Sequence, residues 1–335
     1  MKPIWLTKPN EKWPALEAIN NEVARKWDER LLSFPRQKDK SVPDGFDCLW
    51  YLPDRAEQKD RLCEAIQAHE KTTIHQPLLC LIHGNEQEAH DKFKECVIDK
   101  ELPRLNKLYR SDGNKGIWKI DSFSVNFKNI SELQNEVLKK LVERMLYNYP
   151  DDQEQAIAKI AKRLSEEGRP VILWIKIFTK YCQYQHGLIE QGILDFWAKW
   201  PKTNKRNYRL LVFLSFHYPD KNKMELNLKK LFNQFFQRRF TLTHELSQWE
   251  DDYPDWNQKN QSLRLVVLPE LRPIDEAAVS LWLENDCPDY FSNTRIQAAR
   301  LEMRKFYKKH PKGVPMATLA KKLKDILQEV TKAST

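Results

Sequence analysis

Short, continuously apolar runs alternate with helical segments along this chain of 335 residues, and this alternation constrains the fold more than any other feature. The apolar runs lie at residues 77–83, 117–121, 171–175, 210–216 and 263–268. Helical segments are predicted at residues 54–70, 86–98, 130–147, 151–166, 187–199, 223–238 and 274–285. A strand that is buried on both faces is apolar throughout, and strands that alternate with helices form parallel crossover units. The pattern therefore predicts a doubly wound α/β fold with a parallel sheet flanked by helices.

The two ends of the chain have a different, helical pattern. Apolar residues at helical spacing and then a polar linker predict an N-terminal helical arm over residues 1–45. Near the other end, apolar residues step by three or four at Ile296, Ala299, Met303 and Phe306, and again at Met316, Leu319, Leu323, Ile326 and Val330. Each stripe must be buried against something, so we expect a C-terminal helical hairpin docked on the α/β body or on a partner. The predicted parts are residues 1–45, the α/β domain at 46–292 and the basic helical segment at 293–335.

The positive charge of the chain is concentrated in this last segment. The whole chain has 56 Lys and Arg against 47 Asp and Glu, and a net charge of +9. Residues 295–335 contain eleven Lys and Arg against three Asp and Glu. Such a surface suits nucleic acid or an acidic partner, although terminal helices also carry charge simply because their outer face is solvated. The candidate surface consists of Arg300, Arg304, Lys308, Lys309, Lys321, Lys322 and Lys324.

A second charged stretch, at residues 245–255, is acidic. It is interpreted either as a polar loop around Pro254 or as a neighbour of the basic C-terminal segment within the same chain.

Composition argues against a membrane-spanning, secreted or metal-binding protein. The apolar runs are far shorter than the roughly 20 residues that a membrane helix needs, and the first residues lack the apolar core of a signal peptide. The six cysteines are scattered without a CxxC pair, which is typical of reduced thiols rather than of a zinc site or a disulfide framework. We therefore expect a cytoplasmic protein without a metal or a cofactor.

The turn after the first apolar run lies where a P-loop protein carries the motif GxxxxGK[ST]. Such a loop holds phosphates with backbone N–H groups and its lysine, while the hydroxyl holds Mg²⁺. Here His83 and Gly84 end the apolar run, and Ala89 replaces the second glycine. His90 then stands in place of the lysine and Asp91 in place of the hydroxyl residue. The sequence predicts a degenerate phosphate loop.

Charge at three further positions opposes nucleotide binding. Glu86 and Glu88 are negative where a triphosphate would lie, and Lys176 follows the third apolar run, where a magnesium-binding carboxylate is expected. We therefore predict no catalysis. His83 and His90 are interpreted either as a small polar site or as hydrogen-bonded histidines of the core.

Three short motifs resemble the inactive STAND family. Tyr51-Leu-Pro-Asp-Arg55-Ala-Glu-Gln58 has the form DR-x-x-Q, the run at 77–84 has a proline, apolar residues and then His-Gly, and His90 recurs near the next helix start. The resemblance extends over about residues 46–290. It implies a P-loop NTPase-like fold that has lost its nucleotide-binding residues. It also implies a bacterial protein that occurs with small adaptor domains and with conflict or immune effectors, although the N-terminal arm does not match such an adaptor domain.

Two functions are favoured by these features, and an active NTPase with atypical residues is a third alternative. The first is a non-catalytic scaffold or adaptor that acts through protein contacts in a bacterial defence or signalling assembly, with an effector encoded nearby as a partner. The alternative is a nucleic-acid-binding regulatory protein that uses the basic C-terminal helices. The segment 196–208 mixes aromatic and basic residues, as single-strand binding does, but Phe196 and Trp197 would equally pack a helix onto the sheet.

Overall fold

The computed structural model of the chain describes residues 55–72, 76–106, 109, 117–146, 152–179, 188–202, 208–219, 229–259, 263–285, 287–288 and 291–332. The predicted N-terminal arm at residues 1–45 lies outside these ranges.

A five-stranded sheet with the order β2-β3-β4-β1-β5 forms the centre of the described fold. Its strands are β1 (Leu78–Asn85), β2 (Trp118–Val125), β3 (Pro170–Phe178), β4 (Arg209–Tyr218) and β5 (Arg264–Val267). All paired strands run parallel. Each strand overlaps a predicted apolar run, so the prediction of an α/β fold with a parallel sheet is confirmed. Strand β4 is buried at every position, as a central strand covered on both faces should be.

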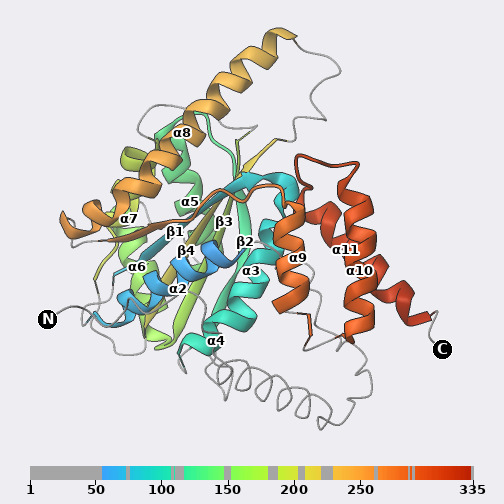
Figure 1. Cartoon of the computed structure of the whole chain (residues 1–335). Helices are drawn as coiled ribbons and strands as arrows, with labels where there is room; N and C mark the ends of the chain where they lie inside the picture. The colour runs from blue at the N-terminus through green and yellow to red at the C-terminus, as the bar shows by residue number, and fades with distance from the viewer. Residues whose placement is uncertain are drawn as a thin grey trace, which may run out of the picture.

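Helices cover both faces of this sheet (Figure 1). One face carries α2 (Ala56–Glu70), α3 (His90–Cys96), the π-helical turn η3 (Val97–Glu101) and α4 (Leu102–Leu105). The other face carries α5 (Ile130–Met145), α6 (Gln153–Glu166), the π-helical turn η6 (Leu188–Leu194) and α7 (Asp195–Ala198). Side chains alternate between the faces along a strand, so Leu79 and Leu81 of β1 join one core and Cys80 and Ile82 the other.

Helix α8 (Lys229–Lys259) extends well beyond the predicted segment 223–238 and passes through Pro254. The interpretation of residues 245–255 as a polar loop is therefore wrong. The helix continues because apolar residues recur at steps of four and three and pack in or against the core, at Leu242, Leu246, Trp249, Tyr253 and Trp256. Its acidic residues Glu245 and Glu250 contact the backbone N–H of Ile189 and the ring of His83.

The C-terminal helices form a hydrophobic cluster of their own, beside the sheet in Figure 1. They are α9 (Glu276–Asn285), α10 (Asn293–Tyr307) and α11 (Met316–Lys332). The predicted hairpin is confirmed by α10 and α11, and the apolar stripe of α11 is buried as far as Ile326. The side chain of Val330 lies outside the described residues.

Helix α9 contributes Val279, Trp282 and Leu283 to the same cluster. The predicted division of the chain at residue 292 stays a prediction. Along the chain, the residues change from the cluster that covers the sheet to the cluster of the C-terminal helices before residue 292, between Leu271 and Ile274.

None of the helices in the described part of the chain has the length and apolar character to cross a bilayer.

Candidate functional site: the loop after strand β1

The end of strand β1 lies against the segment that follows β5, and this close approach requires a glycine at position 84. The N–H of Leu271 donates to the carbonyl of His83 at 2.8 Å. A Cβ atom on Gly84 would lie 2.7 Å from the carbonyl oxygen of Leu271, closer than real Cβ atoms approach. Gly84 is therefore needed for the packing of the segment after β5, independently of any phosphate.

The loop keeps a backbone shape that suits glycine at its far end. Ala89 has φ 55° and ψ 44°, and it is the one non-glycine residue with positive φ among those described. This left-handed conformation costs an L-residue about 1–2 kcal/mol. Its carbonyl accepts from the N–H groups of Lys92 and Phe93 at the start of α3. The loop thus places a strained alanine where the P-loop motif has its second glycine.

His90, in the lysine position, turns into the protein. Its side chain is buried, its Nε2 lies 3.1 Å from the carbonyl oxygen of Asn85, and its Nδ1 lies 2.8 Å from Oγ of Ser215. The ring stacks on His217 with a centroid distance of 4.0 Å. Burial lowers the pKa of His90 well below its usual value, and the charge of His217 would lower it further.

These contacts assign the protons of His90. The carbonyl of Asn85 only accepts, so Nε2 carries the hydrogen of the neutral ring and Nδ1 accepts from the Ser215 hydroxyl. The Ser215 oxygen then accepts from Nε2 of His217, which lies 3.1 Å away. A neutral imidazole with both nitrogens bonded has no charge to offer to a phosphate.

Asp91 of the predicted degenerate phosphate loop and Lys176, the predicted degenerate metal position, form an ion pair with each other. Nζ of Lys176 lies 2.6 Å from Oδ2 of Asp91. They meet because Lys176 of β3 is in register with Ser215 of β4, next to the loop that follows β1. Within the described ranges, no cluster of three or more His, Cys, Asp or Glu side chains could hold a metal ion.

His83 has separate partners from His90. Its Nδ1 lies 2.9 Å from the hydroxyl of Tyr218, and its Nε2 lies 3.0 Å from Oε1 of Glu250. The interpretation of His83 and His90 as hydrogen-bonded core histidines is therefore confirmed.

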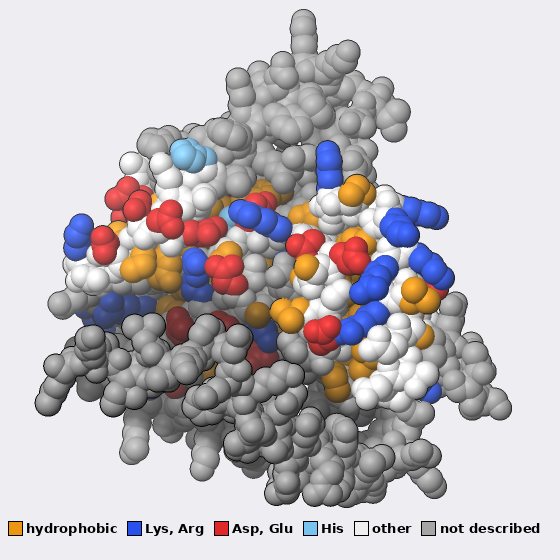
Figure 2. Space-filling model, viewed as in Figure 1, with side chains coloured by type: hydrophobic (Ala, Val, Ile, Leu, Met, Phe, Trp, Pro, Cys, Tyr) orange, Lys and Arg blue, Asp and Glu red, His pale blue; other side chains and the backbone are white. Residues whose placement is uncertain are grey.

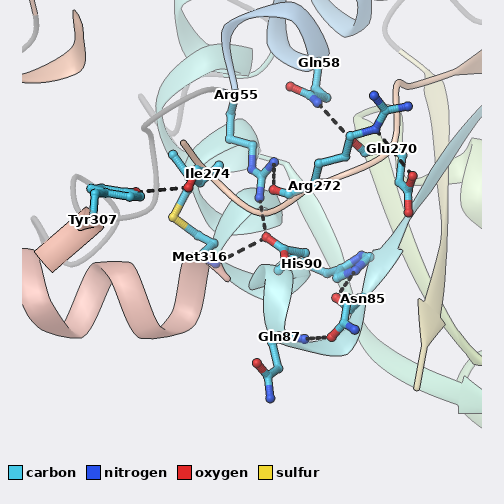
Figure 3. Close-up of polar contacts among 11 residues, drawn as sticks. Arg55, Gln58, Asn85, Gln87, His90, Glu270, Arg272, Ile274, Tyr307 and Met316 are labelled. Carbon is cyan, nitrogen blue, oxygen red and sulfur yellow. Dashed lines mark hydrogen bonds and ion pairs between the residues drawn. The ribbon is translucent and has the colours of Figure 1, made fainter. Parts of the chain in front are cut away.

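Glu88 has a role that the sequence did not reveal. It is buried, and its Oε2 accepts from Nη2 of Arg55 at 3.0 Å and from the backbone N–H of Met316 at 3.2 Å (Figure 3). Burial raises the pKa of Glu88 to about 7, although Arg55 and the Met316 N–H act in the opposite direction. The carboxylate belongs to the protein interior and does not face an open phosphate site.

The DR-x-x-Q residues hold the segment between β5 and α9. Nη1 of Arg55 donates to the carbonyl of Arg272 at 3.3 Å, and Nε2 of Gln58 donates to that of Glu270 at 3.5 Å (Figure 3). Arg55 is as buried as its partner Glu88. A buried arginine needs an acidic partner, so the DR-x-x-Q motif is the one sequence signal for the pair of Arg55 with Glu88.

The predicted basic surface is mostly exposed. Figure 2 shows Lys and Arg side chains gathered over the side of the molecule formed by α9, α10 and α11. Arg300 differs from the others, because it pairs with Glu284 of α9. Lys322 is half-buried, and the remaining members are exposed: Arg304, Lys308, Lys309, Lys321 and Lys324. Lys305 at 2.7 Å and, more weakly, Lys322 lower the pKa of Glu302, so cations from α10 and α11 meet around this residue.

The aromatic residues of segment 196–208 are core residues where they are described. Phe196 and Trp197 are 2% exposed and belong to the cluster beneath α5 and α6. The cations at 205 and 206 lie outside the described residues.

Among solved structures, the chain is similar to the Aeropyrum pernix ORC1 protein in complex with DNA, with 10% identity and a TM-score of 0.35 over 85% of this chain and 64% of that one. It is also similar to Drosophila ORC bound to DNA, with 12% identity and a TM-score of 0.35 over 94% of this chain and 70% of that one. The chain thus spans less than two thirds of the length of the Aeropyrum protein.

No curated protein sequence matches the chain. The family model described as "inactive STAND" matches residues 50–216, which include the Arg55 motif, the whole loop and Lys176. The chain therefore belongs to the inactive STAND family.

Proposed function

We propose that this protein is a non-catalytic scaffold that acts through contacts with other proteins. The observation that supports this function is that the former ligand positions are bonded to the chain itself. His90 bonds Ser215, Asp91 pairs with Lys176, and Glu88 is buried against Arg55. A triphosphate would have to break these contacts and lie beside a buried carboxylate, which is costly. Because the side chains of the chain itself fill the loop, we infer that the fold is used for its outer surface, which contacts other proteins.

Isothermal titration with ATP and Mg²⁺ tests this function. We expect no binding heat at nucleotide concentrations up to the millimolar range. The same preparation must show a cooperative thermal transition, so that an unfolded sample is not mistaken for a non-binding one. Micromolar affinity for ATP would overturn the proposal.

The finer proposal is that the scaffold works in a bacterial defence or signalling assembly, together with an effector encoded by a neighbouring gene. Membership of the inactive STAND family supports it. Co-expression with the product of each flanking gene, followed by size-exclusion chromatography, is the test. We expect one product to co-elute at a fixed ratio, and the absence of any such complex would contradict the proposal.

A second candidate function, nucleic-acid binding, is favoured by the exposed cations of α10 and α11. Removing residues 293–335 is a poor test of this function, because α9 packs in the same hydrophobic cluster as α10 and α11 and would lose its contacts. Charge replacement in the full chain avoids this, with Arg304, Lys308 and Lys309 changed to Ser. The matched control changes three exposed lysines of α5 and α6, namely Lys139, Lys159 and Lys162.

If the basic surface binds nucleic acid, affinity for a fluorescent duplex should fall more than about a hundredfold between about 50 and 200 mM salt. Only the α10 variant should weaken it at low salt. Equal binding by the two variants would remove this surface from consideration, and no binding by the wild type would end the idea.

A further inference from the structure

Glu88 lies where three parts of the molecule meet. It belongs to the short 3₁₀ turn η2 (Glu86–Glu88) of the loop, Arg55 precedes helix α2, and Met316 begins helix α11. The two donors, Nη2 of Arg55 and the N–H of Met316, converge on the same oxygen, Oε2 (Figure 3). A guanidinium group and the N-terminus of a 17-residue helix together form a site for an anion. Its occupant is the carboxylate of the loop.

The apolar contact across this junction is small. The cluster of α9, α10 and α11 is separate from the two clusters that cover the sheet. On the loop side, Ala89 is the partly buried residue that packs against it. The polar contact at Glu88 is therefore a main described link between the loop and this helical unit.

The other described hydrogen bonds near the junction lie on either side of it. Tyr307 donates its hydroxyl to the carbonyl of Ile274 at 3.0 Å, and Ile274 and Val314 exchange two backbone bonds of 2.8 Å. These contacts join residues of the helical unit to one another. Arg55 meanwhile donates to the carbonyl of Arg272, on the side of the sheet. The bond from Met316 to Glu88 connects the two groups.

We propose that Glu88 is an internal anion that fastens helices α9–α11 to the degenerate loop, so that the two parts are joined without a nucleotide. The loop that would surround phosphates in a P-loop protein supplies the negative charge itself, and α11 receives it at its N-terminus. This role of Glu88 goes beyond the scaffold function. Nucleotide binding and the contact between the loop and α11 are measured by different experiments, so one can fail without the other.

Two groups attract the Glu88 carboxylate and one repels it. Burial and, more weakly, Glu270 disfavour its charged form, whereas Arg55 and the N–H of Met316 favour that form, and the pKa of Glu88 is raised to about 7. The carboxyl is ionised above this pH, and the experiments below are therefore run at pH 8.

Met316 allows a matched pair of variants that isolates the bond. Proline lacks an N–H and is well tolerated at the first position of a helix, so Met316→Pro removes the donor while α11 can still form. Met316→Ala keeps the donor and also loses the buried methionine side chain. The difference between the two variants measures the N–H group.

Hydrogen exchange of the full chain, followed by mass spectrometry, is the measurement. Relative to Met316→Ala, we expect Met316→Pro to speed exchange about tenfold in the segments 86–92 and 314–320 together. The α9 segment 276–285 should stay protected in both variants, because the core of the helical unit is intact after release. Loss of protection in all three segments would mean unfolding of the unit, which contradicts the proposal.

A second comparison covers the case in which Met316→Pro does not fold. Glu88→Ala removes the acceptor of both hydrogen bonds, so the segments 86–92 and 314–320 should again exchange faster than in the wild type, with 276–285 unchanged. In the Glu88→Ala background, the difference between Met316→Pro and Met316→Ala should shrink. Unchanged exchange in Glu88→Ala, or an undiminished difference between the Met316 variants, would overturn the proposal.

Discussion

The loop after β1 and the hairpin of α10 and α11 are both rich in charged residues, but they use charge in opposite ways. In the loop, Glu88 and His90 are buried, and Asp91 is bonded to Lys176. On the hairpin, Arg304 and Lys308 are exposed, and the apolar residues are the ones turned inward. Charge in the loop has become part of the framework, and charge on the hairpin faces water. The same residue types thus stabilise the interior in one region and cover an apolar face in the other.

The largest effect should come from breaking the buried pair of the loop. Arg55→Ala leaves the Glu88 carboxylate buried without its cation, and we expect a loss of about 3–5 kcal/mol in the free energy of unfolding. Urea denaturation measures it. The control is Lys162→Ala, which breaks an exposed i,i+4 pair with Glu166 and should cost less than about 0.5 kcal/mol. Similar costs for the two variants would mean that the buried pair is not special.

The inward and outward faces of the hairpin should also differ. Leu323 is fully buried in the C-terminal cluster, so Leu323→Ala should lower the free energy of unfolding by about 3 kcal/mol. Leu301, which is 56% exposed, is the matched leucine on α10, and Leu301→Ala should cost less than about 0.5 kcal/mol. Leu323→Asp should destabilise still more. A Leu323→Asp variant with wild-type melting temperature and partner binding would contradict the docked hairpin.

The pH dependence of the free energy of unfolding tests the burial of Glu88 in the loop. Because the pKa of Glu88 is raised from 4.5 to about 7, the native state holds a proton that the unfolded state has already lost. This contribution is therefore present at acidic pH and disappears as pH rises through 7, by about 2–3 kcal/mol between about pH 5 and pH 8. Denaturation of the wild type and of Glu88→Gln at both pH values isolates it. Parallel profiles for the two proteins would contradict the assignment to Glu88.

The smallest effect concerns the strained turn of the loop. Ala89→Gly places glycine at φ 55° and should raise the free energy of unfolding by about 1 kcal/mol. Gly168 has a similar φ of 62° with open space where a Cβ would lie, so Gly168→Ala should lower stability by about the same amount. Thermal denaturation of both variants checks the pair. If Ala89→Gly were neutral or destabilising, the left-handed turn would not be a source of strain.

Local pattern predicted most of the framework for identifiable reasons. The five apolar runs became strands because strands buried on both faces need apolar side chains at every position. Helix α8 is longer than the sequence predicts: Pro254 and the acidic residues around it resemble a loop, whereas the apolar stripe from Leu242 to Trp256 packs the helix against the core. Proline removes one backbone hydrogen bond, and tertiary packing outweighed that loss.

The sequence by itself determined the parallel α/β framework, the amphipathic hairpin and the loss of the phosphate-binding residues, because each depends on residue type and short-range spacing. Only the tertiary structure decided what replaced those residues. Asp91 and Lys176 are 85 positions apart, and Glu88 and Met316 are 228 positions apart. Such pairs are brought together by the order of strands in the sheet and by the docking of α11. Burial there turns charges that would be solvated on a surface into partners of one another, and no local pattern records that burial.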